Sequence, residues 1–505
     1  MDRRSLALLP LIALAGCDMA PKHVRPAGAV PVTLPQGGAY APASVTAADP
    51  TAIAWRDFFT DEKLRQVIAL GLENNRDLRI ALGNVLQARA QYRVRQADQL
   101  PSINGTGSAT FTNSPFGLGG AGAGAGGGTG TGGTGTGGTG TGVGGGGTGG
   151  VVPGAAAAVT SSDTIKIYQA NIGLSAFEVD LFGRVRNLTK AALEQYLATE
   201  EGQRSTRISL IGETATAYLT LAADQDRLRI AQRTLESFGE SLRLTRAQFQ
   251  TGVASELEAR QAETNYEGAK NDAAALKAQI AADQNALNLL VGTTVPAELL
   301  PTQLGTRSFT VADLPAGLSS EILQRRPDVL QAEHRLMAEN ANIGAARAAF
   351  FPRISLTATL GTISTALSGL FESGTKAWTV APSATLPIFD YGRNLNNLRY
   401  AKASRDVAIA TYERTLQSAF REVADALAQR GTISEQLGAR ERRANAAGVA
   451  ARLADARYRA GVDSFLTSLD SQRTSYAADL DLTQTRLTQA TNLVTLYRTL
   501  GGGLN

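Results

Sequence analysis

The sequence predicts a mainly α-helical fold with a smaller β component, built from two copies of one unit. Three observations support this prediction. Anchor residues recur at fixed offsets along the 505 residues, long stretches keep helical spacing without proline, and four short stretches alternate with period two. Several anchors that share an offset indicate a tandem duplication. We therefore expect two long antiparallel coiled-coil hairpins, one in each copy, together with four short strands.

The plainest repeat relates "FQTGVASELEARQAE" (249–263) to "YRAGVDSFLTSLDSQ" (458–472), which lies 209 residues further along the chain. Nearer the start of each copy, "NRDL" (75–78) and "RPDV" (326–329) are 251 residues apart. The difference of 42 residues requires an insertion in the first copy. We assign it to the stretch 117–150, which consists almost wholly of Gly, Thr and Ala.

Helices are expected where apolar residues keep a spacing of three and four without proline. In the first copy such a pattern continues until Pro101 ends it, and Gly252 separates two further helices. Gly461 takes the same place in the second copy. The expected helices are 56–99, 183–249, 255–290, 319–350, 392–458 and 464–500.

Strands are expected over 102–112, 165–181, 352–361 and 378–388, where small or apolar side chains alternate with polar ones. A membrane-spanning strand needs roughly 9–11 residues, and each run is at least about that long. Four strands cannot close a barrel, since known single-chain bacterial barrels begin at about eight. The chain must therefore share a barrel with other copies or bury its sheets in a soluble core. We favour the shared barrel, because the helices carry only narrow apolar stripes and cannot cover a sheet.

The N-terminus has the features of a secretory signal: a basic start, an apolar run too short to span a bilayer, and small residues. "LAGC" (14–17) resembles the bacterial lipobox, which directs lipid attachment to Cys17. Cys17 is the only cysteine, so a disulfide within the chain is excluded. The alternative is a stray cysteine at the end of an ordinary signal.

Composition and motifs divide the chain into five parts. These are a lipoprotein signal peptide (1–16), an N-terminal tether (17–55), a first repeat (56–292), a linker (293–318) and a second repeat (319–501). The Gly-rich stretch falls between the two strands of the first repeat. The simplest explanation of this stretch is a low-complexity expansion that the fold tolerates. The stretch is not a phosphate-binding loop, because it lacks the Gly-Lys-Ser/Thr ending.

Several function classes find no support in the sequence. The formal net charge is only +4, so no nucleic-acid partner is expected. The two histidines, His23 and His334, stand in unrelated contexts, and we interpret His334 as structural. No Cys/His cluster has metal-ligand spacing and no nucleophile motif is visible. We therefore expect no catalytic site, no metal site and no cofactor other than the lipid on Cys17, and the protein is not expected to be an enzyme.

The motifs taken together resemble a known family. "LQRRPDVLQAEHRLMAENANIGAARAAFFPRISLTATLG" (323–361), "PIFDYGR" (387–393) and the paired "QTGV" and "RAGV" turns are similar to the TolC-type outer-membrane efflux proteins. The lipobox and "RRPDV" resemble the OprM-like or NodT-like lipoprotein branch of resistance-nodulation-division (RND) pumps. The resemblance implies a homotrimer whose chains each give four transmembrane strands to a twelve-stranded barrel, with a periplasmic helical tunnel. It further implies an outer-membrane location and passive export of small toxic compounds, which an inner-membrane RND pump and a periplasmic adaptor deliver.

The resemblance also assigns roles to the tips of the two hairpins. The turns at Gly252, Val253, Gly461 and Val462 are implied to dock the adaptor. For the glycines, a purely structural explanation agrees with the family, since a tight turn needs them.

The implied gate lies beside these turns. Asp470 matches an acid that forms a ring at the tunnel entrance by threefold symmetry, and Thr467 replaces a second acid there. Tyr458 and Glu258 match positions that hydrogen-bond between helices in the closed state. Asp463 stands where a basic lock residue often sits, so that lock is not expected. The alternative for Glu258 and Asp470 is ordinary solvated helix charge.

Two other functions stay open at this point. One is a type I conduit for secreted proteins, and the other is a non-conducting, lipid-anchored coiled-coil scaffold. Duplicated strands argue against the scaffold, which has no use for lipid-facing strands. Asp18 leaves a conflict over location, because in some bacteria an Asp after the lipidated Cys retains lipoproteins in the inner membrane.

Overall fold

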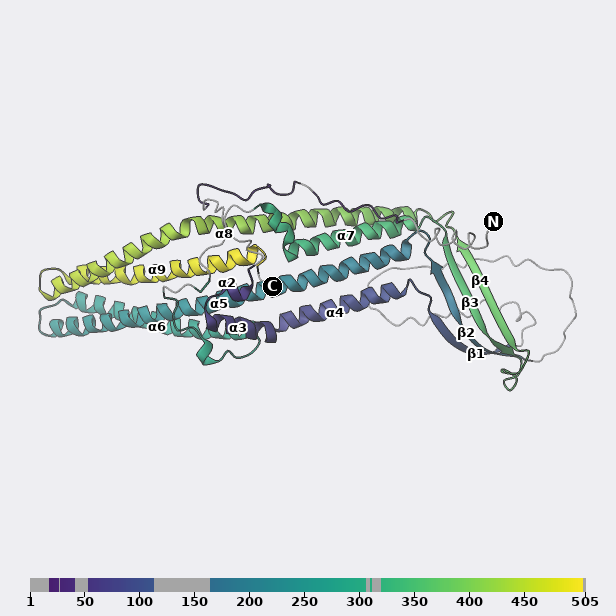
Figure 1. Ribbon diagram of the computed structural model, residues 1–505. Coiled ribbons are helices and arrows are strands. Elements are labelled where there is room, and N and C mark those ends of the chain that lie inside the picture. The colour runs from purple at the N-terminus through teal and green to yellow at the C-terminus, as the bar shows by residue number, and fades with distance from the viewer. Residues whose placement is uncertain are drawn as a thin grey trace. The chain divides into compact units, whose positions relative to one another are not determined.

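The computed structural model describes residues 18–26, 28–40, 53–112, 164–305, 309–310 and 319–502. It contains two units, each described by itself, whose elements Figure 1 labels. Among the described residues, the sheet unit comprises those within Met1–Met19, Arg95–Arg186 and Ala345–Asn394, and the helical unit those within Ala20–Val94, Asn187–Gly344 and Leu395–Asn505. The expected signal peptide, Cys17 and the Gly-rich stretch lie outside the described residues.

Two long helical hairpins make up most of the helical unit. The 67-residue α5 (Arg184–Gln250) is followed by the 36-residue α6 (Glu256–Val291), and the 67-residue α8 (Arg393–Arg459) by the 35-residue α9 (Phe465–Thr499). At 1.5 Å per residue, each long helix spans about 100 Å. Figure 1 shows α6 folding back along α5 and α9 along α8. The matching lengths confirm the duplicated hairpins.

No helix in the described part of the chain combines the length and the apolar character that crossing a bilayer requires.

The single helix expected over 56–99 is wrong, because the chain breaks twice. The observed helices are α2 (Trp55–Phe58), α3 (Glu62–Asn74) and α4 (Arg76–Ala97). Phe59 leaves the helical conformation and pairs as an isolated bridge with Thr310. Asn75 has an extended ψ of 134° and accepts a hydrogen bond from the backbone N–H of Leu78, which caps α4.

The helix expected over 319–350 also begins later than predicted. A short 3-10 helix, η3 (Ser320–Arg325), precedes α7 (Pro327–Ala348). Arg326 lies between them with ψ of 138°. Steric conflict with the proline ring disfavours the helical conformation in the preceding residue, whereas proline itself fits the first turn of a helix. The "RRPDV" motif therefore ends one helix and starts the next.

The breaks at Asn75 and Arg326 each meet the end of the last helix of their own repeat. The side-chain amide of Asn75 donates to the carbonyl of Leu290 at 2.8 Å, near the C-terminus of α6. In the second repeat, Nη1 of Arg326 donates to the carbonyl of Thr499 at 2.7 Å, at the end of α9. These bonds satisfy carbonyls that a helix end leaves without an intrahelical partner. In each repeat, the residue at the helix break therefore binds the C-terminal end of the last helix of the same repeat.

The main hydrophobic core of the helical unit gathers around the short N-terminal helices. Phe58 and Phe59 are fully buried, and the Phe58 ring stacks on that of Tyr497 of α9 with 4.0 Å between the ring centroids. Described residues of the N-terminal segment contact the helical unit. Leu34 is 2 % exposed within the core, and Arg25 pairs with Glu333 of α7 at 2.6 Å.

The sheet unit contains one antiparallel sheet in the order β1-β2-β3-β4. Its strands are β1 (Ile103–Thr112), β2 (Ile165–Val179), β3 (Arg353–Ser364) and β4 (Lys376–Thr385). The register aligns Ile172, Leu360 and Trp378 across three strands, and these side chains are 58, 60 and 74 % exposed. Polar residues such as Thr106 and Asn171 alternate with the apolar positions along β1 and β2. The sheet therefore has one exposed apolar face, as the period-two pattern predicts.

The last strand is shorter than the expected 378–388. It ends at Thr385, which pairs with Arg353, the first residue of β3. Beyond that point β3 offers no backbone partner, and Ile388 is 94 % exposed. The strand expected over 165–181 ends at Val179 and contains a bulge after Leu174, so its alternation is interrupted.

Candidate functional site: the paired hairpin tips

The two hairpin turns have the same backbone geometry. In the first, the N–H of Gly252 donates to Phe249 O at 3.0 Å and the N–H of Val253 donates to Gln248 O at 2.8 Å. In the second, Gly461 donates to Tyr458 O and Val462 to Arg457 O, both at 2.9 Å. This pair of bonds defines a Schellman motif, which satisfies the last carbonyls of a helix.

The backbone conformation of both turns requires glycine, whereas the space around each position would admit a side chain. Gly252 has φ of +75° and Gly461 has φ of +72°, in the left-handed region that other residues rarely adopt. A Cβ at either position would meet nothing within 4 Å. The turns predicted at these glycines are therefore confirmed in position.

Side-chain caps start the return helices. Ser255 accepts a hydrogen bond from the backbone N–H of Glu258, and the Glu258 carboxylate accepts from the N–H of Ser255 at 2.7 Å, which makes a capping box. Ser464 caps α9 by accepting from the N–H of Thr467 at 3.2 Å. Glu258 thus binds within its own turn, and among the described residues it makes no hydrogen bond to another helix.

Matched apolar side chains are exposed at the two tips. Val253 and Leu257 are 78 and 66 % exposed in the first turn, and Val462 and Leu466 are 62 and 59 % exposed in the second. In a Schellman motif the residue after the glycine commonly packs back on its helix. Here both valines stay in solvent, so the two tips expose the same pair of apolar groups.

A small hydrophobic cluster beneath the tips joins the two hairpins. Its buried members are Phe238 and Leu242 of α5, Ala262 and Ala269 of α6, and Phe465 and Leu469 of α9. The ring of Tyr458, on α8, lies 5.4 Å from that of Phe465 and packs against the cluster. All four hairpin helices therefore meet close to their turns.

Tyr458 also makes a polar link between the hairpins. Its hydroxyl donates to Oε1 of Gln248 on α5 at 2.8 Å. Both residues belong to the Schellman motifs of their turns, although the 209-residue offset makes Tyr458 equivalent to Phe249 and not to Gln248. The sequence pointed to Tyr458 but not to Gln248, because a glutamine beside a turn carries no distinctive signal.

Asp463 is held by an ion pair within the second turn. Its carboxylate accepts from Nε and Nη2 of Arg457 at 2.7 and 2.9 Å. These hydrogen bonds lower the pKa of the Asp463 carboxyl below its ordinary value. The acid therefore neutralises an arginine of its own turn, a pairing that spacing along the sequence did not reveal.

Asp470 lies on the exposed surface of α9, next to the buried Leu469. Among the described residues it makes no hydrogen bond or ion pair, which leaves its carboxylate available to solvent. Thr467 is also exposed, and its hydroxyl lies 3.0 Å from that of Ser464. The structure thus brings Tyr458 into contact with the other hairpin, while Glu258, Asp463 and Thr467 act within their own turns.

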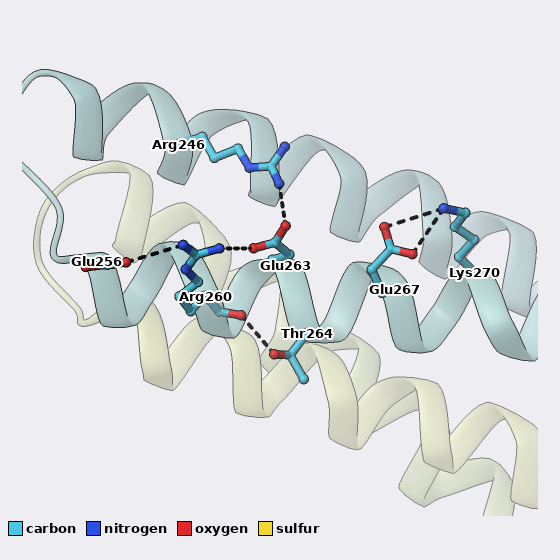
Figure 2. Close-up of polar contacts among 7 residues, drawn as sticks. All are labelled: Arg246, Glu256, Arg260, Glu263, Thr264, Glu267 and Lys270. Atoms are coloured by element: carbon cyan, nitrogen blue, oxygen red, sulfur yellow. Dashed lines mark hydrogen bonds and ion pairs between the residues drawn. The ribbon is translucent and has the colours of Figure 1, made fainter.

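An ionic network along the first hairpin connects α5 to α6 (Figure 2). Glu263 accepts from Arg246 of α5 at 2.8 Å and from Arg260 at 3.0 Å, and Arg260 also reaches Glu256 at 3.4 Å. The hydrogen bond from Arg260 is the largest contribution that lowers the pKa of the Glu263 carboxyl. Because these groups are exposed, we expect each pair to add little to stability. Only the Arg246–Glu263 pair joins the two helices in this network, and the other contacts lie within α6.

Comparisons with known proteins agree with this architecture. A family model described as "Outer membrane efflux protein" matches residues 67–293 and 318–502. The chain is 43 % identical over 503 residues to the toluene efflux pump outer membrane protein TtgC of Pseudomonas putida, covering 99 % of this chain and 95 % of TtgC. It is 40 % identical over 497 residues to the outer membrane protein OprJ of Pseudomonas aeruginosa, covering 98 % of this chain and 95 % of OprJ.

A solved structure is similar over nearly the whole chain. The open-state MtrE outer membrane channel of Neisseria gonorrhoeae matches this chain with a TM-score of 0.81 and 35 % sequence identity. The match covers 97 % of this chain and 99 % of the MtrE chain. The fold and the paired tips therefore define a TolC-type outer-membrane channel protein. The chain belongs to the outer membrane efflux protein family.

Proposed function

We propose that this protein is the outer-membrane conduit of a tripartite efflux system. An inner-membrane RND pump and a periplasmic adaptor deliver small toxic compounds, which this chain conducts passively across the outer membrane. The observation that carries the proposal is the combination, in one chain, of an open-edged sheet with an exposed apolar face and two hairpins with matched apolar tips.

We propose a homotrimer in the membrane. Within the described residues, β1 and β4 each pair on one side only, and an open edge in lipid leaves backbone groups without partners. Three copies of a four-stranded sheet supply twelve strands, enough for a closed barrel. The exposed Ile172, Leu360 and Trp378 would then face the acyl chains.

The lipid anchor and the adaptor site complete the proposal. Cys17, one residue before the described segment begins, carries the lipid that fixes the chain to the outer membrane. The adaptor docks on the tips, where Val253 and Val462 offer apolar area beside Gly252 and Gly461. Its binding surface must contain two equivalent apolar pockets, because the two turns are near copies.

The gate at the tips consists of contacts that a conducting state must break. The Tyr458–Gln248 hydrogen bond holds the two hairpins together, and the Arg457–Asp463 pair stiffens the second turn. Under threefold symmetry, the solvent-exposed Asp470 carboxylates form a ring that attracts cations to the entrance.

Reconstitution of the purified protein tests the proposal. We expect a detergent-stable trimer on native electrophoresis and a conducting pore in planar bilayers. A deletion strain should accumulate more of a test drug, and complementation should require the cognate pump and adaptor genes. Monomeric protein without conductance would favour the non-conducting scaffold, and export of a polypeptide with no effect on drug accumulation would favour the secretion conduit.

A further inference from the structure

The apolar face of the sheet carries charged residues at one end only. The charged residues of the four strands are Lys166 and Glu178 in β2, Arg353 in β3 and Lys376 in β4. The register places Lys166 and Lys376 on the face that contains Trp378. Glu178 and Arg353 lie on the opposite face. Within the described strands, the apolar face therefore has two cations and no acid.

Both lysines are exposed at the edge of this face. Lys166 is opposite Phe111 of β1, and Lys376 is opposite Thr362 of β3. Among the described residues, neither ammonium group makes a hydrogen bond or an ion pair, and Glu372, the one acid in the connection 365–375, is not bonded to Lys376. Each positive charge can therefore attract an anion from outside the chain.

An aromatic side chain accompanies each lysine on the same face. Tyr168 follows Lys166 by two residues, and Trp378 follows Lys376 by two, so each aromatic ring lies one step further into the sheet. The ring of Phe111 meets that of Tyr168 edge-on, with 5.9 Å between the ring centroids. Trp and Tyr are typical of the depth at which a membrane protein meets the lipid headgroups. The lysines, one step nearer the strand ends, are therefore placed at headgroup depth.

The two pairs of lysine and aromatic residue occupy equivalent places in the two repeats. Lys166 lies 17 residues before Gly183, and Lys376 lies 16 residues before Gly392. Both glycines have positive φ and follow the last strand of their repeat. The difference of one residue is the extra residue of the bulge in β2. Because side chains alternate between faces, the bulge brings Lys166 to the same face as Lys376.

Equivalent positions are also staggered alike across the sheet. The β2 residue level with Lys376 is Ala170, which is four residues from Lys166. Ile103 and Ile354, which the 251-residue offset relates, show the same stagger of four residues when Ile103 is followed across β2 to β3. A constant stagger is what a closed, tilted barrel requires, and it brings equivalent residues to one depth. Three copies would therefore carry six such lysines, on every second strand.

The spacing of these lysines and their end of the sheet define what they can meet. Neighbouring lysines are separated by about 10 Å across the strands and about 13 Å along them. The helices α5 and α8 follow β2 and β4 along the chain, so the lysines lie at the other end of both strands. With the hairpins in the periplasm, as proposed above, this end of the sheet lies in the outer leaflet.

We propose that the lysine ring, which consists of Lys166 and Lys376 of all three copies, binds the phosphate groups of lipopolysaccharide in the outer leaflet. The acyl chains of this glycolipid would cover the apolar face below the ring. The two phosphates on its disaccharide would pair with neighbouring lysines, whose long flexible side chains extend toward them. A lipid with a single phosphate reaches only one lysine at this spacing. The inference rests on the proposed homotrimer and adds the class of lipid that its barrel selects.

Native mass spectrometry of the full-length trimer in detergent tests the ring. We expect saturable binding of lipid A that carries both phosphates, and little binding of lipid A from which both phosphates have been removed. Lys166→Gln and Lys376→Gln should each weaken the binding about fivefold, as expected for one lysine near an anionic lipid surface. Lys402→Gln removes an exposed lysine of α8 and should leave the binding unchanged.

A relocated charge separates the ring from the overall charge of the protein. The double substitution Lys376→Ala and Ala377→Lys keeps the net charge but moves the ammonium group to the opposite face of β4. We expect this variant to bind lipid A as weakly as Lys376→Gln does. Phosphatidylglycerol should bind the wild type more weakly than lipid A with both phosphates.

Two results would overturn the inference. One is unchanged binding of lipid A when Lys166→Gln and Lys376→Gln are combined, and the other is binding of phosphatidylglycerol as tight as that of lipid A. Trimer formation and conductance, measured on the same preparations, separate this inference from the proposed function. A conducting trimer whose lipid binding does not depend on the two lysines refutes only the ring. Protein that forms no trimer refutes the proposed assembly, and the ring with it.

Discussion

At the scale of single residues, the glycines of the turns and of the helices have opposite roles. Gly252 and Gly461 adopt left-handed backbone conformations with open space around them. Gly268 also has open space around it, but it lies within α6, where glycine only adds backbone freedom to the unfolded chain. The same substitution is therefore expected to change stability in opposite directions.

We predict that Gly252→Ala and Gly461→Ala each lower stability by about 1 kcal/mol, through left-handed backbone strain alone. Gly268→Ala, the matched control, should raise stability by about 0.5–1 kcal/mol. Amide hydrogen exchange at the hairpin tips would measure both effects. Faster exchange in Gly268→Ala, or unchanged exchange in both turn variants, would contradict the prediction.

His334 of α7 supplies a pH-dependent contact inside the helical unit. Its Nδ1 lies 2.7 Å from the carboxylate of Glu194 on α5, and this hydrogen bond raises the pKa of His334 above its ordinary value. A raised folded-state pKa means that the stabilising contribution is full below about pH 6.5 and disappears as pH rises through the folded pKa. The interpretation of His334 as a structural residue fits this geometry.

We predict that the wild type loses thermal stability relative to His334→Gln as pH rises above about 6.5, because a charge-assisted hydrogen bond worth about 1.5 kcal/mol is lost. Apparent melting temperature at a fixed scan rate would be followed across this range. Glu194→Gln should flatten the dependence in the same way. Parallel curves for the wild type and His334→Gln would show that the pair does not titrate in this range.

At the scale of elements, each hairpin is built locally but positioned by the other. Capping and the Schellman motif define each turn from its own residues. Contact between the hairpins depends on the cluster around Phe465 and on the Tyr458–Gln248 bond. Movement of one hairpin against the other must break these contacts first.

We predict that Tyr458→Phe increases the open probability of reconstituted channels. The ring still packs on Phe465, but a hydrogen bond worth about 1 kcal/mol is lost, which shifts the closed–open equilibrium about fivefold. Single-channel recording in planar bilayers provides the measurement. Tyr266→Phe is the control, because among the described residues the Tyr266 hydroxyl makes no hydrogen bond. Equal open probability in all three proteins would remove Tyr458 from the gate.

The limits of prediction at this scale lie in contacts between distant segments. Spacing without proline predicted α5, α6, α8 and α9 almost to their ends. It did not predict the break at Asn75, since that residue leaves the helix to bind Leu290, 215 positions away. The pairing of Tyr458 with Gln248 was missed for the same reason, because the two residues are 210 positions apart.

At the scale of the whole molecule, the proposed assembly rests on the exposed apolar face of the sheet and on the two edges that stay open among the described residues. The row of Ile172, Leu360 and Trp378 is too exposed for a water-facing surface of a stable monomer. The duplication supplies two pairs of strands, but among the described residues these four strands form an open sheet and not a closed barrel. The proposed assembly in the membrane would cover the apolar face with lipid and supply strands to both edges.

We predict that Trp378→Arg prevents assembly of the detergent-stable trimer, because an arginine on the lipid face costs about 2–4 kcal/mol per copy near the bilayer centre. Thr379→Arg, one residue further along β4 on the opposite face, should still assemble and should change conductance instead. Heat-modifiable mobility on electrophoresis gives the assembly readout. Normal trimers from Trp378→Arg would mean that this face does not meet lipid.

The duplication, the long hairpins, the glycine turns and the alternating strands can be predicted from the sequence, because each follows from local conformational preference and periodicity. Three features become visible only in the folded chain: Asn75 and Arg326 interrupt helices, Leu34 and Arg25 bind the N-terminal segment, and Gln248 faces Tyr458. Those features depend on which distant groups satisfy one another's hydrogen bonds and charges. No local pattern encodes such a choice, because it is made when the two repeats pack together.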